Sequence, residues 1–268
     1  MTAETNTNAD AAPALPEVVD RTRWQAEIDG LRIREKAHTR EGDAIAAARR
    51  RLPMVEVDPS ITLTGPHGPV SLLDTFEGRR QLAAYYHMWH DGCSAAQQCE
   101  GCTFFNSQVR ELSYLHSRDI TYATFCQGPY EESVRYRDFM GWDVPWYSVR
   151  DCADELLAGR PFFLLACYLR DGDRVFETYW TTIRGFEAFS PSHGLMDMTV
   201  YGRQETWEDS PTGWPQHWVA TDPGVWRTHG RPTAQWSRLP GEQRQPRPGD
   251  DQRRSPTRTS GTCCHPAS

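Results

Sequence analysis

The chain has 268 residues, of which 38% are hydrophobic and 11% aromatic, enough for one large globular domain or two small ones. Its formal net charge of -7 argues against a general nucleic-acid-binding protein, because phosphate contacts need clustered cations. No apolar run approaches the length of a membrane span, and the polar start MTAETNTNAD lacks the basic and apolar regions of a signal peptide. We therefore expect a cytoplasmic protein that binds neither nucleic acid nor membrane.

The N-terminal part of the chain is predicted to hold a disordered segment and a long helix. Residues 1–18 are small and polar, with Pro13 and Pro16 among them. Residues 19–52 have helical spacing of apolar side chains, and Asp20 or Thr22 can cap the start. A helix of this length ahead of the main domain can pack across it or pair with a second copy, so we expect a homodimer.

Residues 53–200 alternate between strand and helix patterns. Apolar residues alternate with polar ones from 55 to 63, and 81–89 (QLAAYYHMW) is an apolar run typical of a buried central strand. Asp171 and Gly172 lie between two apolar runs, which predicts a β-hairpin. The remaining predicted elements are a turn at 65–69, a helical turn at 71–76, helices at 103–116 and 130–140, and strands at 119–126, 145–149, 161–169 and 174–180. This order predicts an α/β domain whose central sheet is parallel at its core and antiparallel at the hairpin.

The last third of the chain differs in composition from the rest. Residues 184–225 are rich in Trp, Pro and Gly and are expected to wrap the domain. Within this part, 201–236 is predicted to be a Trp-rich extension that packs on the domain, because large aromatic side chains usually serve cores. Residues 237–268 are Arg, Pro, Gly, Gln and Ser in the main, and are predicted to be a disordered tail.

The stretch QQCEGCTFFNS contains a Cys-x-x-Cys pair, Cys99 and Cys102. With eight cysteines in the chain this spacing alone is weak evidence, but the pair lies between a predicted central strand and an amphipathic helix. Free N–H groups and the dipole at a helix start stabilise a thiolate, so Cys99 would be the attacking thiol and Cys102 the resolving one. Glu100 opposes this effect, since a carboxylate beside Cys99 disfavours the thiolate.

A metal site is the alternative for this region. Five candidate ligands lie within sixteen residues, and their imidazole and thiolate groups suit zinc or copper: His87, His90, Cys93, Cys99 and Cys102. Against this, His87 lies on a strand whose residues should be buried, and only one Cys-x-x-Cys is present. The redox interpretation needs no cofactor, and we expect none.

The other cysteines are given structural interpretations. Cys167 is predicted to be a small core residue, and Cys126 ends a strand near the expected active edge without taking part. Cys152 has no assigned role. The vicinal pair Cys263 and Cys264 lies in the predicted tail, where it is expected to be incidental.

Several segments together resemble the thioredoxin-like family of unknown function numbered 899 (DUF899), whose members are often called predicted dithiol-disulfide oxidoreductases. The resemblance covers about 19–215. It rests on the motif with its following Thr103 and Phe104 and on these stretches: RRLPMVEVD (50–58), SLLDTFEGRRQL (71–82), MGWDVPWYS (140–148), DGDRVFETYWTTIRG (171–185) and MTVYGRQETWEDSPTGWP (198–215). It implies a thioredoxin-like three-layer α/β/α fold with a central mixed sheet, a long N-terminal helix and an irregular C-terminal extension.

By position, the resemblance implies that Cys99 and Cys102 are the redox pair and that a disulfide or thiol compound, protein or small molecule, is the substrate. It also implies a cis-proline before the hairpin; Pro161 occupies that place, and Pro145 is the other candidate. Ordinary thioredoxin has a Trp before the first cysteine and Gly-Pro between the two, and this chain has neither. A thiol peroxidase is a further alternative, with Thr103 and Arg184 as its candidate partners.

Overall fold

The computed structural model describes residues 14–219 and 224–240, and the chain divides into two compact units. One unit combines the N-terminal 52 residues with 192–225, and the other combines 53–191 with the chain from Trp226 onward. The second unit is therefore discontinuous in sequence: it is interrupted after Pro191 and continues at Trp226. The predicted tail 237–268, with Cys263 and Cys264, lies for the most part outside the described residues, as do the first 13 residues.

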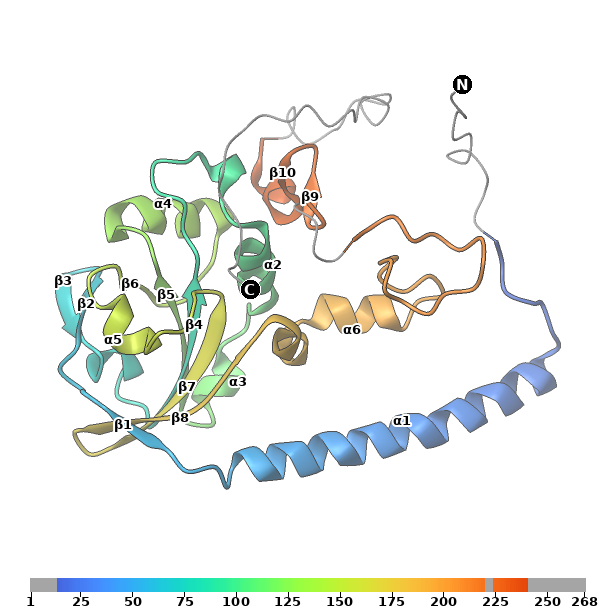
Figure 1. The fold of residues 1–268 in the computed structure, drawn as a ribbon, viewed down its shortest axis with the longest axis horizontal. Helices are drawn as coiled ribbons and strands as arrows, with labels where there is room; N and C mark the ends of the chain where they lie inside the picture. Colours follow the sequence, from blue (N-terminus) through green and yellow to red (C-terminus); the bar gives the residue numbers. More distant parts are fainter. Residues whose placement is uncertain (1–13, 220–223, 241–268) are drawn as a thin grey trace. The chain divides into compact units, whose positions relative to one another are not determined.

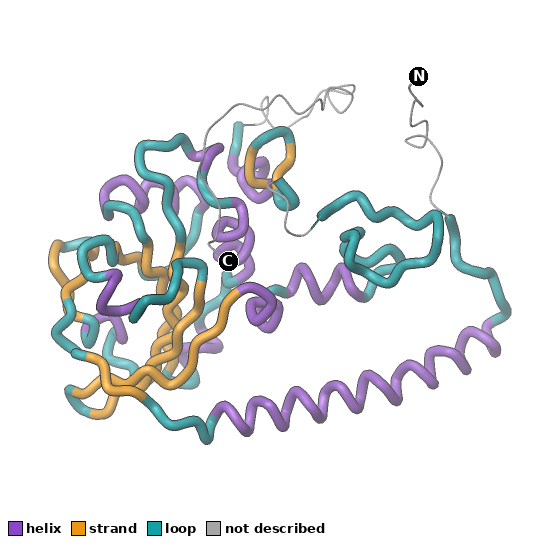
Figure 2. Tube along the Cα trace, in the orientation of Figure 1, coloured by secondary structure: helices purple, strands orange, loops and turns teal. Residues whose placement is uncertain are grey.

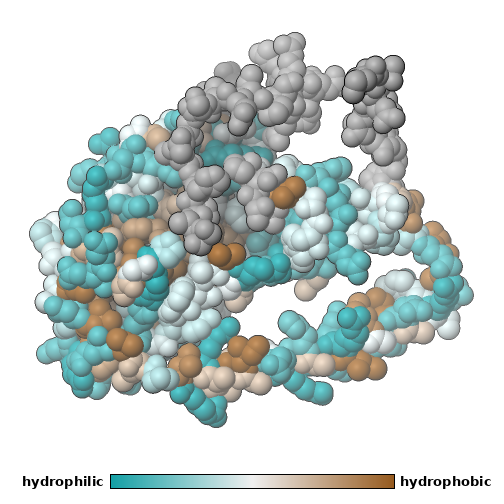
Figure 3. Space-filling view, in the orientation of Figure 1, coloured by the Kyte–Doolittle hydropathy of each residue, from teal (hydrophilic) through white to brown (hydrophobic). Residues whose placement is uncertain are grey.

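The first unit contains α1 (Arg21–Arg49) and α6 (Pro191–Asp197), the latter beginning at the boundary between the units. Helix α1 begins where expected, because Oδ1 of Asp20 accepts hydrogen bonds from the backbone N–H groups of Thr22 and Arg23, both at 2.8 Å. None of its residues is buried. Figure 3 shows apolar side chains interspersed with hydrophilic ones along it. The expected pairing of this helix with a second copy stays a prediction.

An eight-stranded mixed sheet forms the centre of the second unit, in the order β1-β8-β7-β4-β5-β6-β2-β3 (Figures 1 and 2). Its strands are β1 (Val55–Val57), β2 (Thr62–Gly65), β3 (Gly68–Ser71), β4 (Gln81–His87), β5 (Ile120–Cys126), β6 (Trp146–Ser148), β7 (Leu164–Asp171) and β8 (Arg174–Thr182). Strands β4, β5 and β6 are parallel, whereas β7 and β8 form the antiparallel hairpin predicted at Asp171 and Gly172.

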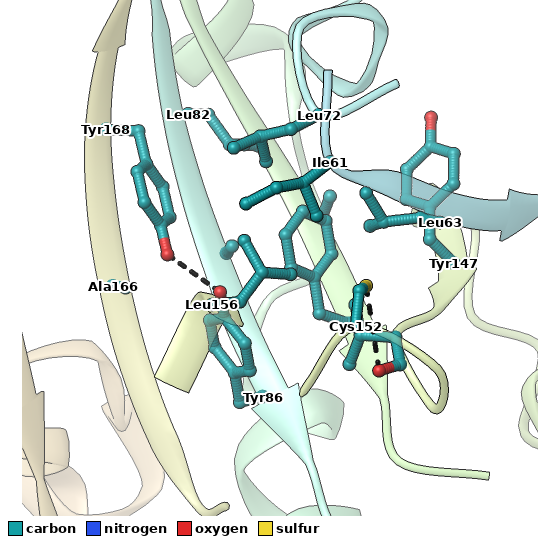
Figure 4. Close-up of a cluster of buried hydrophobic side chains, with 14 of the residues drawn as sticks. Ile61, Leu63, Leu72, Leu82, Tyr86, Tyr147, Cys152, Leu156, Ala166 and Tyr168 are labelled. Carbon is teal, nitrogen blue, oxygen red and sulfur yellow. Dashed lines mark hydrogen bonds between the residues drawn. The ribbon is translucent and has the colours of Figure 1, made fainter. Parts of the chain in front are cut away.

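Helices cover both faces of this sheet, because alternate residues of β4 point to opposite sides. Leu82, Ala84 and Tyr86 enter one core, together with η1 (Asp74–Phe76) and α5 (Ala153–Leu157). Figure 4 shows this core, in which the hydroxyls of Tyr86 and Tyr168 form a 2.7 Å hydrogen bond.

Tyr85 points to the other face and enters a second core, with α2 (Glu100–Gln108) and α4 (Tyr130–Met140). The result is the expected three-layer α/β/α arrangement with its mixed sheet. A strand, the cysteine pair, a helical crossover and an antiparallel hairpin follow one another along this unit.

Several observed elements differ from the predicted ones. The single helix expected at 103–116 is two helices, α2 and α3 (Ser113–His116), because Val109 is extended (φ -100°, ψ 105°). Helix α2 also begins earlier, at Glu100. The short helix α5 was not predicted.

The C-terminal part is divided rather than uniform. Residues 192–225 belong to the first unit, and the segment from Trp226 belongs to the unit that contains the α/β sheet. That segment contains β9 (Arg227–Thr228), β10 (Arg231–Pro232) and η4 (Thr233–Arg238). His229 and Gly230 both have positive φ, 49° and 75°, as a two-residue hairpin turn requires. The residues of the expected extension, 201–236, are thus divided between the two units, and its packing on the domain as one extension stays a prediction. We call residues 226–238 the C-terminal strap.

Candidate active site

Cys99 and Cys102 lie at the junction of β4 and α2, where the sequence places them. Cys99 is the N-cap of α2, and its sulfur accepts a hydrogen bond from the backbone N–H of Cys102 at 3.4 Å. Cys102 lies one turn into the helix and is fully buried, and its sulfur accepts a 3.2 Å hydrogen bond from the backbone N–H of Met88. No disulfide joins the two sulfurs in this structure.

The pKa values of the two thiols are shifted in opposite directions. Hydrogen bonding from the Cys102 side chain and from the backbone N–H groups of Cys102 and Gly101 lowers the pKa of Cys99, against burial and the charge of Glu100. Burial is the main cause that raises the pKa of Cys102 well above its ordinary value, and the neighbouring Cys99 adds to it. The pair is therefore one partly exposed thiol of lowered pKa and one fully buried thiol of raised pKa.

Cys102 lies against tyrosine hydroxyls in the second core. Burial and the two cysteines raise the pKa of Tyr85 well above its ordinary value. The Tyr85 hydroxyl lies beside the sulfur of Cys102 but forms no hydrogen bond of good geometry with any described residue. Burial also raises the pKa of Tyr136, to about 12. Both phenols stay protonated at neutral pH, so neither places a negative charge beside the thiols.

A chain of hydrogen bonds connects the first turn of α2 to its surroundings. The hydroxyl of Thr103 donates to the carbonyl oxygen of Cys99 at 2.7 Å and lies 2.7 Å from the hydroxyl of Tyr136. Gln235 of the C-terminal strap donates to Tyr136 at 2.6 Å and to the carbonyl oxygen of Ala95 at 2.7 Å. Thr103 thus supports the helix backbone, and nothing places it as a peroxidase residue.

The strap also reaches the two residues between the cysteines. Glu100 forms an ion pair with Arg227, and its Oε1 accepts a hydrogen bond from the backbone N–H of Trp226 at 3.4 Å. The ring of Trp226 stacks on Phe104 with 5.0 Å between centroids and 6° between planes.

Gly101 is enclosed by aromatic rings. A Cβ atom there would lie 3.0 Å from the ring of Phe163 and 3.1 Å from that of Trp226. This explains why the second residue between the cysteines has no side chain.

The proline expected opposite the pair differs from the prediction. No described peptide bond is cis, so the bonds before Pro161 and Pro145 are both trans. Pro161 is exposed, and Phe163, two residues later, contacts the motif instead. Phe163 has a positive φ of 71°, and its N–H donates to the carbonyl oxygen of Tyr86 at 3.0 Å.

The alternative metal site does not assemble. Among residues 14–219 and 224–240, no three His, Cys, Asp or Glu side chains converge on a point that could hold a metal ion. His87 is a core histidine, with its ring 5.2 Å from that of Trp146 and 6.0 Å from that of Trp142. Its Nδ1 lies 3.4 Å from Nδ2 of Asn106. His87 is therefore a buried side chain of the core, as its position on a predicted buried strand indicated.

The remaining predicted residues lie as follows. Burial raises the pKa of Cys126 to about 12 and that of Cys152 to about 11, so neither is an activated thiol. Cys167 is half-buried in β7. Arg184, the candidate peroxidase cation, has a side chain that is 62% exposed and pairs with Glu187.

Sequence reasoning missed the contribution of the strap, in particular Trp226, Arg227 and Gln235. The sequence contains one weak signal for it, Gly230, because glycine readily adopts the positive φ that a two-residue hairpin turn requires. The turn pairs Arg231 with Thr228 and Pro232 with Arg227 across the hairpin. No local sequence pattern indicates that this hairpin packs against α2.

Comparison with known proteins supports the family resemblance. The family model described as "Bacterial protein of unknown function (DUF899)" matches residues 13–222, most of the chain. The chain belongs to the DUF899 family. No curated protein matches it significantly. Within the described residues, no helix is long and apolar enough to cross a membrane.

Three solved structures are among those that resemble this DUF899 protein. A protein assigned as the thiol:disulfide interchange protein DsbE from Chlorobium tepidum is 14% identical, with a TM-score of 0.33 over 51% of this chain and 92% of that one. An assigned electron transfer protein from Aquifex aeolicus VF5 is 15% identical, with a TM-score of 0.33 over 50% and 91%. BsSco, of the Sco family of cytochrome c oxidase assembly proteins, is 12% identical, with a TM-score of 0.34 over 53% and 95%. Likenesses of this size do not bear on the activity of this chain.

Proposed function

We propose that this DUF899 protein is a thiol–disulfide oxidoreductase that acts through Cys99 and Cys102. The observation that carries the proposal is the asymmetry of the pair: an N-capping thiol of lowered pKa beside a fully buried thiol of raised pKa. Attack on a disulfide needs a thiolate that a substrate can reach, and release of the product needs a second thiol nearby. The proposed substrates are disulfides of proteins or small molecules.

The proposed reaction has two exchange steps. The Cys99 thiolate attacks one sulfur of a substrate disulfide, which forms a mixed disulfide and releases the other substrate sulfur as a thiolate. Cys102 then loses its proton and attacks the Cys99 sulfur, which releases the second substrate thiolate and leaves a Cys99–Cys102 disulfide. The substrate gains two electrons and the protein loses two. A separate dithiol reductant must return the pair to the reduced state.

Pro161 keeps a supporting place in this proposal. Its ring fixes φ at the entry to β7, two residues before the left-handed Phe163 that contacts Gly101. We propose that Pro161 helps to set this turn and does not contact the reacting sulfurs.

The test is to replace the resolving thiol. A Cys102→Ser variant should form a mixed disulfide through Cys99 with a model disulfide and should hold it, because no internal thiol can displace the product. Mass spectrometry of the non-reduced protein should find this adduct on Cys99, while wild-type protein should instead form the Cys99–Cys102 bond under mild oxidant.

Cys93→Ser is the matched control, because Cys93 lies in the preceding loop and is half-buried like Cys99. This variant should behave as wild type. The proposal is wrong if no adduct accumulates on Cys99 in Cys102→Ser and the wild-type pair never oxidises.

A further inference from the structure

Arg227 of the C-terminal strap contacts the region of the cysteine motif through all three nitrogen atoms of its guanidinium. Nε of Arg227 pairs with Oε2 of Glu100, the residue directly after Cys99. Nη1 donates to the carbonyl oxygen of Ala96 at 2.6 Å, and Nη2 donates to that of Gln98 at 2.8 Å. The guanidinium therefore spans the loop that enters the motif and the first turn of α2.

The charged groups of Arg227 and Glu100 are both largely buried. The side chain of Arg227 is 22% exposed and that of Glu100 is 14% exposed. Charges withdrawn from water to this degree are poorly screened, so each acts strongly on its neighbours and leaving one unpaired is costly. The planar fork of arginine suits a carboxylate together with two carbonyl oxygens, a set that lysine cannot contact at once.

Glu100 is a disadvantage for a reactive thiol. Its carboxylate is the one charge near Cys99 that disfavours the thiolate, against the hydrogen bonds from the helix start. A cation held on that carboxylate offsets the effect. The chain supplies this cation from far along the sequence.

We propose that Arg227 is a positioning residue of the redox site: it neutralises the Glu100 carboxylate beside Cys99 and thereby sets how readily Cys99 becomes a nucleophile. The functional importance of Arg227 depends on the proposed function, but the experiment that tests its effect on Cys99 does not. The reactivity of Cys99 toward an alkylating agent can be measured whether or not the pair performs disulfide exchange.

The other titratable groups around Cys99 do not supply this effect. Cys102, Tyr85 and Tyr136 face it from α2, β4 and α4, and burial raises the pKa of all three, so they are uncharged at neutral pH. His90, in the loop after β4, has its pKa lowered by burial and by Arg227, so it too is neutral there. Glu100 and Arg227 remain as the charged pair that can act on Cys99.

The experiment is the pH profile of Cys99 alkylation by iodoacetamide in the full, reduced chain, with the modified cysteine assigned by mass spectrometry. Arg227→Gln should move the midpoint for Cys99 to higher pH and slow its alkylation at pH 7 at least about threefold, because a nearby carboxylate that has lost its cation raises a thiol pKa by roughly half a unit or more. Glu100→Gln should move the midpoint the opposite way. The Glu100→Gln/Arg227→Gln double variant should lie between the two single variants.

Arg227→Lys separates charge from loop geometry, because it keeps the cation and loses the carbonyl contacts. Its midpoint should stay closer to wild type than that of Arg227→Gln. The proposal is overturned if Arg227→Gln leaves the midpoint unchanged, or if Arg227→Lys shifts it as far as Arg227→Gln does. Should Arg227→Gln not fold, Glu100→Gln alone decides, since an unchanged or raised midpoint there contradicts the proposal.

The two proposals fail separately. A wild-type pair that never oxidises removes the oxidoreductase function but leaves the alkylation profiles as they are. Unchanged profiles remove the role of Arg227 and leave the Cys102→Ser adduct intact.

Discussion

Single buried side chains in this molecule have ionisation behaviour that their residue types alone do not indicate. His87 is the clearest case: full burial lowers its pKa to about 3, with a smaller effect from His90. Its ring packs among Trp142, Trp146 and Tyr136, and its Nε2 has no hydrogen-bond partner among the described residues. The imidazole of His87 therefore stays neutral in the folded protein well into the acid range.

This burial predicts how stability depends on pH. Below about pH 6.5 the unfolded chain protonates His87 while the folded chain does not, so the unfolded state binds more protons and the free energy of unfolding falls as pH falls. The loss from this group begins near pH 6.5, proceeds at up to about 1.4 kcal/mol per pH unit, and stops near pH 3. Urea denaturation of wild type and His87→Phe between pH 7 and pH 4.5 should give a smaller pH dependence for the variant. Equal dependences in the two proteins would contradict this assignment.

The residues of the site were predictable to different degrees. Cys99 and Cys102 follow from a local pattern, a cysteine pair at a strand end and helix start. Glu100 was correctly expected to oppose the Cys99 thiolate. Arg227 and Trp226 could not be found in this way, because they reach the motif through packing between segments far apart in the sequence, for which no local pattern exists.

Helix α2 is the element on which the proposed chemistry depends, and its first turn is packed on two sides. Phe163 approaches from the start of β7, and Trp226 approaches from the C-terminal strap. The same turn presents N–H groups to the sulfur of Cys99. Tight packing and thiol activation therefore depend on one short stretch of backbone.

Gly101→Ala tests that packing. Helix propensity favours Ala over Gly by about 1 kcal/mol, but the added Cβ would lie 3.0 Å from Phe163 and 3.1 Å from Trp226. Overpacking typically costs about 1–3 kcal/mol, so the variant should be less stable than wild type in urea denaturation followed by tryptophan fluorescence.

Gly30→Ala in α1 is the matched control, because nothing lies within 4 Å of its Cβ position. The same substitution should there increase helix content in far-UV circular dichroism. A Gly101→Ala protein as stable as wild type would mean that the rings of Phe163 and Trp226 move aside freely.

At the level of elements, local patterns account for most strands and for the caps. Asp20 begins α1, and Gly141, in the left-handed conformation at φ 60°, ends α4 as predicted. The break between α2 and α3 was missed because apolar spacing continues through Val109 and Leu112 although the backbone there is extended. Side-chain period alone does not detect an interruption that preserves the apolar face.

At the scale of the whole molecule, the α/β domain is built from two separate stretches of sequence. Trp226 stacks on Phe104, and the buried Gln235 hydrogen-bonds to Tyr136 and to the backbone at Ala95. These contacts make the strap part of the domain rather than an appendage. The sequence indicated an aromatic extension that packs on the domain but could not show which of its tryptophans do so.

A chain that ends after Val225 tests the contribution of the strap. Loss of the half-buried Trp226 and the fully buried Gln235, with exposure of their partners, should lower the free energy of unfolding by about 2 kcal/mol or more, since truncation of a fully buried tryptophan typically costs about 3–5 kcal/mol. Urea denaturation is the measurement. A chain that ends after Pro240 keeps every strap contact named above and is the control. Equal stability of the two truncated chains would contradict this role.

The interruption of the domain has a consequence for its biosynthesis. The ribosome completes the cysteine motif long before it reaches Trp226, and at 5–20 residues per second the interval between them lasts on the order of ten seconds. During that interval β4 and α2 can form, while Glu100 still lacks its cation and Gly101 lacks one of its two covering rings. The surroundings of Cys99 are therefore complete only after the ribosome has added Trp226 and Arg227.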